Sequence, residues 1–252
     1  MAFFLIGLYF AIIVIRLVVR RIKKMESHLS KRLRHVAAYV PDGAKLLDVG
    51  SDHAYLPIFL VEAGQIQKAI AGEVVKGPFA SALKNVSQYG LTEHIEVRLA
   101  DGLAAFEARD AVDCITICGM GGRLIADILA AGKEKLQGIE RLILQPNNRE
   151  DELRAWLSAN AFRIIAETIM TENGKYYEII VAEPGQQSLT DQEQRFGPFL
   201  SQERSSVFVA KWQKERDKLV YALSCVPATK PVERASISQK IKAIEEVISH
   251  ES

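Results

Sequence analysis

Residues 45–57 read KLLDVGSDHAYLP, which is typical of the first strand and loop of an α/β sheet. Residues 45–49 are a short apolar run that predicts a buried strand, and a glycine and three polar residues follow directly. Pro57 disfavours a helical Leu56, so we expect the next helix to begin near Pro57 and Asp52 to lie in the loop before it. In open α/β sheets, ligands bind outside the carboxyl ends of the strands. This loop is therefore a candidate binding site.

The same alternation of a short apolar run and a longer helical stretch recurs along the chain. The predicted strands are 45–49, 69–73, 95–99, 113–118 and 141–144. The predicted helices between them are 57–63, 78–89, 124–131 and 150–159, and another helical pattern, at 27–39, precedes the first strand. Repeated strand–helix units with right-handed crossovers predict a parallel, doubly wound α/β sheet.

The pattern changes after residue 160. Runs 162–170 and 176–182 are strand-like, and the residues TENGK between them indicate a β-hairpin. Residues 184–198 contain Pro-Gly and Gly-Pro pairs, which are typical of a linker. Beyond it we expect two helices, folded back as an antiparallel hairpin around Pro227–Pro231. The first carries an apolar stripe of Phe208, Trp212, Leu219 and Leu223, and the second carries the short coiled-coil seam Ile237, Ile241, Ile244 and Ile248.

Glycines and acidic residues gather at the ends of the predicted strands. Glu73 follows Asp48 by about 25 residues, where a carboxylate can accept hydrogen bonds from both ribose hydroxyls. The fingerprint G-x-G-x-x-G is missing after the first strand, which argues against a dinucleotide. A cofactor with a ribose and no pyrophosphate fits better, and S-adenosylmethionine has that form, with Asp101 placed to accept its adenine amino group. The alternative for Glu73 and Asp101 is a solvated loop end or a helix cap. The predicted cofactor-binding residues are Asp48, Gly50, Ser51, Glu73, Asp101, Gly102, Gly119, Met120 and Gly121.

The net charge of +1 is unevenly distributed along the chain. Residues 41–185 carry 14 basic and 21 acidic residues, a net charge of −7, so there is no broad basic surface of the kind that nucleic-acid binders present. RNA contact must therefore rely on local patches, such as Lys31, Arg32 and Arg34 and the basic residues of the C-terminal helices. Three cysteines without framework spacing argue for a reducing compartment, and no His/Cys cluster predicts a metal site.

Residues 1–24 form an apolar leader with a basic end. Ala2–Ile15 is an unbroken apolar run, and Arg20, Arg21, Lys23 and Lys24 lie beyond it. One interpretation is a membrane anchor whose basic flank stays cytoplasmic. The other is a mis-extended start, with translation beginning at Met25. Under both, we expect the folded body to be cytoplasmic, with membrane contact only if the leader is real.

From about Leu29 onward the chain resembles the bacterial tRNA adenine-22 N1-methyltransferases. The segments that carry the resemblance are LSKRL (29–33), DVGSDHAYLP (48–57), AGE (71–73), GPF (77–79), ICGMGG (117–122), LQPN (144–147) and GPFL (197–200). The resemblance implies a Rossmann-like class I methyltransferase sheet with a C-terminal antiparallel helical hairpin. It also implies S-adenosylmethionine as cofactor and N1 of adenine 22, in the D-arm of tRNA, as the target. We divide the chain accordingly into the leader 1–24, where the resemblance stops, a cofactor-binding methyltransferase domain 25–185 and a tRNA-binding helical hairpin 186–252. No protein partner is indicated.

The expected reaction needs positioning more than a strong base, because adenine N1 already carries a lone pair. The methylated ring becomes cationic, and a carboxylate beside it can accept from the exocyclic amine and stabilise the charge. Asp52 is the predicted catalytic residue, with capping of the next helix as the alternative. A base stacked in tRNA must also be turned out to reach such a pocket. The predicted substrate-binding residues are His53, Tyr55, Gln145, Asn147, Lys31 and Arg32.

Two other functions stay open from the sequence alone. The first is a methyltransferase of the same fold that acts on another RNA or on a small molecule. The second is a membrane-tethered RNA-binding protein that uses the fold as a scaffold and binds no cofactor.

Overall fold

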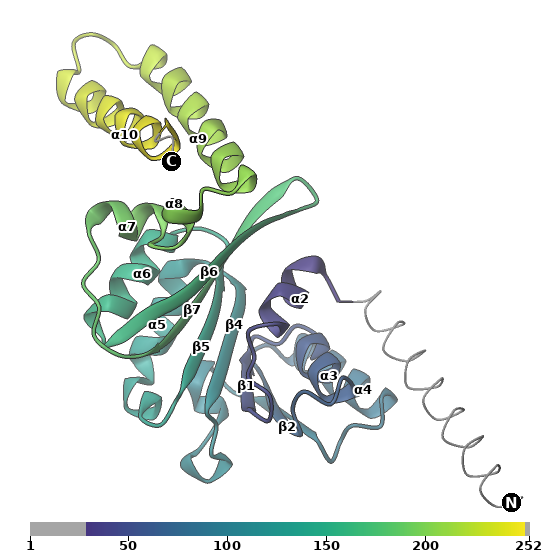
Figure 1. The fold of residues 1–252 in the computed structure, drawn as a ribbon. Coiled ribbons are helices and arrows are strands. Elements are labelled where there is room, and N and C mark those ends of the chain that lie inside the picture. The colour runs from purple at the N-terminus through teal and green to yellow at the C-terminus, as the bar shows by residue number, and fades with distance from the viewer. Residues whose placement is uncertain (1–28, 250–252) are drawn as a thin grey trace, which may run out of the picture.

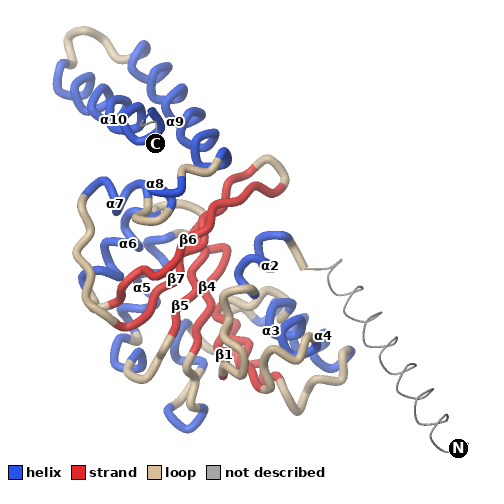
Figure 2. Tube along the Cα trace, viewed as in Figure 1, coloured by secondary structure: helices blue, strands red, loops and turns tan. Residues whose placement is uncertain are grey.

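The computed structural model describes residues 29–249, so both interpretations of the leader 1–24 lie outside the described residues. A twisted sheet runs through the molecule, with helices on both faces and two long helices at one end (Figures 1 and 2). The strands are β1 (Lys45–Val49), β2 (Lys68–Glu73), β3 (Ile95–Leu99), β4 (Cys114–Met120), β5 (Arg141–Pro146), β6 (Phe162–Glu172) and β7 (Lys175–Pro184). The helices are α2 (Lys31–Ala37), α3 (Tyr55–Glu62), α4 (Lys76–Gln88), α5 (Gly122–Ala131), α6 (Glu150–Ala159), α7 (Asp191–Phe196), α8 (Leu200–Glu203), α9 (Ser206–Cys225) and α10 (Pro231–Ser249).

The seven strands form one sheet in the order β3-β2-β1-β4-β5-β7-β6. Strands β1 to β5 are parallel, while β7 runs antiparallel to both β5 and β6. The predicted doubly wound sheet with a terminal antiparallel hairpin is confirmed. The carboxyl ends of β1, β2, β4 and β5 lie at one edge, where the polar loops were expected.

Successive residues of the strands point to opposite faces of the sheet and pack into two hydrophobic cores, one on each face. Along β5, Leu142 and Leu144 pack toward α5 and α6, whereas Ile143 between them packs toward α2, α3 and α4. All three are fully buried. A strand covered on both faces reads as a continuous apolar run, which is why the sequence signal was clear.

The β6–β7 hairpin is longer than the parallel strands and extends beyond them (Figure 2). Its turn is Asn173–Gly174, and both residues have positive φ, as a two-residue hairpin turn requires. The hairpin also contains a β-bulge: Ile164 pairs with Ala182 and Ala166 with Val181, which leaves Ile165 as an extra residue.

A third core joins the C-terminal helices to the hairpin. Phe196 of α7, Phe208 and Trp212 of α9 and Ile244 of α10 pack together with Ile169 of β6. Helix α10 folds back along α9, as predicted (Figure 1). The packing stripe of α10 differs from the predicted one: Ile241, Ile244 and Val247 are buried, whereas Ile237 and Ile248 are half-buried.

Most predicted boundaries differ from the observed ones by one to four residues, and three of the differences affect the loops or the linker. Helix α3 begins at Tyr55, because a proline at the third helical position lacks only an N–H that has no intrahelical acceptor. Strand β4 continues through Gly119 to Met120, beyond its predicted end at residue 118. The predicted linker 184–198 contains α7, whose start is a capping box formed by Thr190 and Glu193.

Candidate active site

The loop after β1 is fixed to β2 by its backbone. The N–H groups of Gly50 and Ser51 both donate to the carbonyl oxygen of Gly72, at 2.9 and 3.2 Å. Gly50 has a φ of 66°, and a Cβ atom there would lie 2.3 Å from Cε of Met120. Only glycine combines this backbone with so close an approach.

Asp52, His53 and Ala54 continue the loop in an uncommon conformation. All three have positive φ, at 40°, 71° and 57°. Non-glycine residues rarely adopt such angles, and a run of them persists only where the surroundings hold it. Here the Asp52 N–H donates to Oε1 of Glu73 at 2.6 Å, and Asn85 Nδ2 donates to the His53 carbonyl at 3.0 Å.

The Asp52 side chain points outward and is 83% exposed. The N-cap of α3 is Ala54, and no side chain caps that helix. The capping alternative for Asp52 is therefore wrong, and its carboxylate is available to a ligand. The imidazole Nε2 of His53 lies 3.5 Å from Asp52 Oδ1, and the His53 ring lies 5.4 Å from that of Tyr55.

Two other acids of the site are buried. Asp48 accepts hydrogen bonds from the hydroxyls of Ser51 and Thr116, both at 2.6 Å. Burial raises the pKa of Asp48 to about 6, although both hydroxyls oppose the shift. Burial also raises the pKa of Glu73, partly offset by the bond from the Asp52 N–H. These carboxylates hold the loop and keep two anionic acceptors at the ends of β1 and β2.

The ends of β4 and β5 are tied together by amides. Gln145 is fully buried, and its Oε1 accepts from the Gly119 N–H at 3.0 Å and from Nη1 of Arg32. Its Nε2 donates to the Pro146 carbonyl at 2.7 Å and to Oδ1 of Asn147 at 3.2 Å. Asn147 in turn donates to the Gly119 carbonyl at 2.7 Å. The side-chain oxygen and nitrogen of Gln145 thus both form hydrogen bonds within the protein, whereas the Asn147 side chain is exposed.

These elements enclose a pocket of about 360 Å³ at the carboxyl edge of the sheet. Arg32 forms one wall, with its guanidinium carbon 5.6 Å from the centre of the Tyr177 ring. Sequence reasoning missed the contributions of Leu33, Leu56, Cys118 and Tyr177. The residues that line the pocket are Arg32, Leu33, Asp48, Gly50, Ser51, Asp52, Leu56, Cys118, Gly119, Met120, Asn147 and Tyr177.

Asp101 and Gly102 line a neighbouring hollow of about 440 Å³. Its other wall is α5, which contributes Leu124 and Ile128. A Cβ atom on Gly102 would lie 2.9 Å from Cγ2 of Ile128. Seven of the nine predicted cofactor residues therefore line the pocket or this hollow, and the other two, Glu73 and Gly121, line neither.

Besides Glu73 and Gln145, four predicted residues line neither the pocket nor the neighbouring hollow. Lys31 is exposed, and its backbone N–H donates to Glu172 at 2.7 Å. Gly121 is the N-cap of α5, where a Cβ atom would lie 3.0 Å from Oδ1 of Asn148. His53 and Tyr55 lie side by side at the rim, on the loop and at the start of α3.

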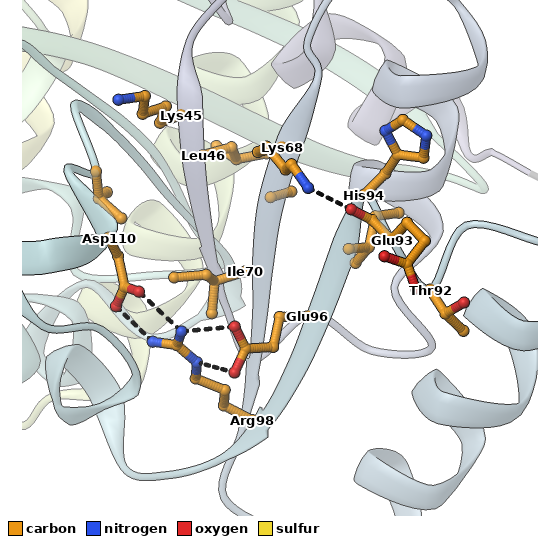
Figure 3. A pocket seen from close by; sticks show the side chains of 13 residues that line it. Lys45, Leu46, Lys68, Ile70, Thr92, Glu93, His94, Glu96, Arg98 and Asp110 are labelled. Atoms are coloured by element: carbon orange, nitrogen blue, oxygen red, sulfur yellow. Dashed lines mark hydrogen bonds and ion pairs between the residues drawn. The ribbon is translucent and has the colours of Figure 1, made fainter.

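Another hollow, of about 410 Å³, lies near the amino ends of β1 and β2 (Figure 3). There Arg98 donates to Asp110 at 2.5 and 2.9 Å and to Glu96 at 2.7 and 2.8 Å. The Arg98 guanidinium lowers the pKa of Asp110 to about 2. Arg98, Glu96 and Asp110 thus bind one another, and the hollow is at the edge opposite to the binding loops, so we assign it a structural role.

Within residues 29–249, no helix is both long and apolar enough to cross a membrane. The same described part contains no group of three His, Cys, Asp or Glu side chains placed to hold a metal ion.

A parallel sheet with an antiparallel terminal hairpin, and with acidic, glycine-containing loops in place of a dinucleotide fingerprint, defines a Rossmann-like methyltransferase. The chain belongs, more narrowly, to the tRNA (adenine(22)-N(1))-methyltransferase family, whose model matches residues 46–246. The family resemblance and the fold class predicted from the sequence are confirmed.

Individual relatives agree with this assignment. The tRNA (adenine(22)-N(1))-methyltransferase of Bacillus subtilis is 42% identical over 236 residues, covering 89% of this chain and 99% of its own. A Streptococcus pneumoniae protein, provisionally named a tRNA (m1A22) methyltransferase, was solved in complex with S-adenosyl-L-methionine. It is 61% identical, with a TM-score of 0.83, covering 87% of this chain and 99% of its own. A Mycoplasma relative, M. capricolum TrmK, was solved with S-adenosyl-homocysteine; it is 30% identical, with a TM-score of 0.78, covering 87% and 97%.

Proposed function

We propose that this chain transfers the methyl group of S-adenosylmethionine to N1 of adenine 22 in the D-arm of tRNA. The observation that carries the proposal is family membership over residues 46–246 together with the 42% identical B. subtilis enzyme of that activity. The cofactor is supported by the S. pneumoniae and M. capricolum relatives, which bind it or its product. A different RNA, a small-molecule substrate and a cofactor-free scaffold find no support among these relatives.

The residues at the carboxyl edge fit this cofactor. Bound S-adenosylmethionine supplies an electrophilic methyl group on a sulfonium sulfur. Because Gly50 has no side chain, the methyl end of Met120 packs directly beside its main chain at the pocket wall, and Glu73 offers a buried carboxylate for ribose hydroxyls. Asp101 and Gly102 would hold the adenine of the cofactor in their partly apolar hollow. The remaining assignments are Asp48, Ser51, Gly119 and Met120 as the pocket wall and Gly121 as the adjoining start of α5.

The target adenine would enter at the exposed side of the pocket. The Asp52 carboxylate accepts from the exocyclic amine and stabilises the positive charge that the ring acquires. Asn147 binds the base edge and Tyr177 stacks on its face, with Arg32 steadying that ring. Gln145 acts as a positioning residue, because all four of its amide contacts go to the protein.

We assign His53, Tyr55 and Lys31 to the rim, where they face the rest of the tRNA. Residues 186–252, with α9 and α10, are proposed to bind the tRNA body, and residues 25–185 are proposed to carry the chemistry. Because the substrate is a tRNA, the proposed site of action is the cytoplasm.

The test is a methylation assay on an unmodified tRNA transcript with radiolabelled S-adenosylmethionine. Reverse transcription stops at 1-methyladenine, so it maps the methylated position directly. We expect one stop at position 22, abolished in a transcript that carries guanine there. Methylation at another position, or label found only on small molecules, would refute the proposal.

A further inference from the structure

A groove of about 410 Å³ continues from the active-site pocket toward the C-terminal helices. Strand β5 pairs with β7 only as far as Leu144 and Ile180, so the end of β7 nearest the turn has no strand on that side. The groove lies between this free end, the β5–α6 loop and α9. Asn147 and Tyr177 line both the pocket and the groove. The lining residues are Asn147, Glu150, Gly174, Lys175, Tyr176, Tyr177, Lys211, Lys214, Glu215 and Lys218.

The groove is cationic in a chain whose residues 41–185 carry a net charge of −7. Its lining contains four lysines and two glutamates, a net charge of +2. Lys211 binds Glu150 and Glu178 at its floor, at 2.8 and 2.6 Å. Lys175, Lys214 and Lys218 are exposed along the groove. A local patch of this kind is what an RNA contact needs when the surface as a whole is not basic.

The two tyrosines lie on opposite faces of the hairpin. Alternation along β7 turns Tyr177 toward Arg32 and the pocket, and Tyr176 toward α9, where the ammonium of Lys214 lies 5.9 Å from the centre of its ring. Both rings are half-buried, so each is fixed on one side and accessible on the other. Rigid aromatic faces interleaved with cations are typical of surfaces that bind single nucleic-acid strands.

We propose that this groove binds the RNA strand next to the extruded adenine, with phosphates on Lys175, Lys214 and Lys218 and a neighbouring base stacked on Tyr176. The inference rests on the proposed function and deepens it, because it assigns the path by which the tRNA reaches the pocket. A single strand fits better than a duplex, since a turned-out base leaves its neighbours partly unstacked.

The charge part is tested with the double variant Lys214→Gln/Lys218→Gln. Its control, Lys84→Gln/Lys133→Gln, removes two exposed lysines that line neither the pocket nor the groove. The affinity for a fluorescent tRNA transcript is measured by anisotropy over a salt series, and S-adenosylmethionine affinity by calorimetry. For the groove variant we expect at least about tenfold weaker tRNA binding and a salt slope reduced by about 1.4–1.8, from the loss of two phosphate contacts. Cofactor affinity should not change. An unchanged slope, or an equal loss in the control, would overturn the proposal.

The stacking part is tested with Tyr176→Ala and Tyr176→Phe. We expect the alanine variant to bind tRNA about tenfold or more weakly at every salt concentration, and phenylalanine to restore binding. Equal binding by all three proteins would remove Tyr176 from the path. The proposed function fails separately: a wild-type chain that binds S-adenosylmethionine but methylates no tRNA at adenine 22 contradicts that assignment. If the Lys214→Gln/Lys218→Gln variant methylates tRNA at the wild-type rate, only the groove proposal is contradicted.

Discussion

At the residue scale, the site depends on how the loop after β1 presents Asp52. Three consecutive positive φ values turn its side chain away from the protein, while its backbone N–H is held by Glu73. The carboxylate is therefore oriented without being used by the fold. Such a residue can be changed chemically with little effect on the loop, provided that the replacement tolerates a left-handed backbone.

Asp52→Asn satisfies that condition, because asparagine has the same shape and adopts left-handed angles readily. It keeps one acceptor oxygen and removes the charge. We expect kcat to fall about 100-fold or more, since the charge on the methylated ring is no longer balanced. S-adenosylmethionine affinity, measured by calorimetry, should stay at the wild-type value. A variant with unchanged single-turnover rates would show that the carboxylate charge plays no part.

Asp48 gives the cofactor-free protein a pH-dependent stability. Burial raises its pKa from 3.8 to about 6. Between those values the native state binds more protons than the unfolded state, so stability falls as the pH rises through this window. At pH values above this window, the ionised carboxylate of Asp48 lowers the free energy of unfolding by about 3 kcal/mol. We expect Asp48→Asn to remove this component. The free energy of unfolding in urea, wild type minus variant, should therefore decrease by up to about 3 kcal/mol from pH 4 to pH 7, and parallel pH profiles would contradict the assignment.

At the element scale, helix α7 ends at a residue whose surroundings leave no room for a side chain. Its C-cap, Gly197, has a φ of 85°, and a Cβ atom there would lie 2.5 Å from Oε2 of Glu167 and 2.8 Å from Nη2 of Arg154. Gly43 has a similar φ of 77° but nothing within 4 Å of its Cβ position. Alanine substitutions at the two glycines therefore distinguish the cost of a left-handed backbone from the cost of a steric clash.

Gly43→Ala should cost about 1–2 kcal/mol, the strain of a left-handed alanine. Gly197→Ala should cost at least about 2 kcal/mol more, because it must also displace a buried ion pair. Urea denaturation of both variants provides the comparison. Equal losses would mean that the residues around Gly197 move aside freely.

Local patterns predicted the elements well, because they depend on neighbours in sequence. The buried run 45–49 and the turn at Asn173–Gly174 carry their own signals, and the capping box at Thr190 was present but not used. The site was predicted less completely. The pocket contact of Tyr177 follows from the pairing of β7 with β5, in which Leu144 lies opposite Ile180, 36 residues further along the chain. The side-chain oxygen of Gln145 accepts hydrogen bonds from Arg32 and Gly119, which are also distant in sequence. Such contacts depend on register and long-range packing, which a residue pattern does not contain.

At the scale of the whole molecule, a buried charge network ties the sheet to the C-terminal helices. Arg154 of α6 is fully buried and binds Glu167 at 2.7 Å and Glu178 at 2.5 Å. Glu178 also accepts from Lys211 of α9 at 2.6 Å. Burial alone would raise the pKa of Glu178, but Lys211 and Arg154 outweigh it and lower the pKa. The hairpin helices are therefore attached by both charge and the third core.

Arg154→Met leaves two buried carboxylates without their main partner, so we expect a loss of about 3–5 kcal/mol in the free energy of unfolding. The control is Arg123→Met, whose guanidinium is 73% exposed and pairs loosely with Asp127 and Glu152 at 3.8 and 3.5 Å. It should change stability by no more than about 0.5–1 kcal/mol. Trp156 and Trp212, in different cores, report the transition by fluorescence. Similar losses in both variants would argue against a role for the network.

The extra residue Ile165 determines on which side of the sheet the C-terminal helices are attached. Before it, even-numbered residues such as Ile164 face α5 and α6; after it, odd-numbered residues such as Glu167 and Ile169 do. A hairpin lacking that one residue would present Glu167 and Ile169 to α2 and α3 instead, since side chains alternate with a period of two. Arg154 would then have no carboxylate on β6 to bind, and α9 would lose its packing contact with Ile169 of β6. The placement of the C-terminal helices relative to the sheet thus depends on one extra residue in a single strand.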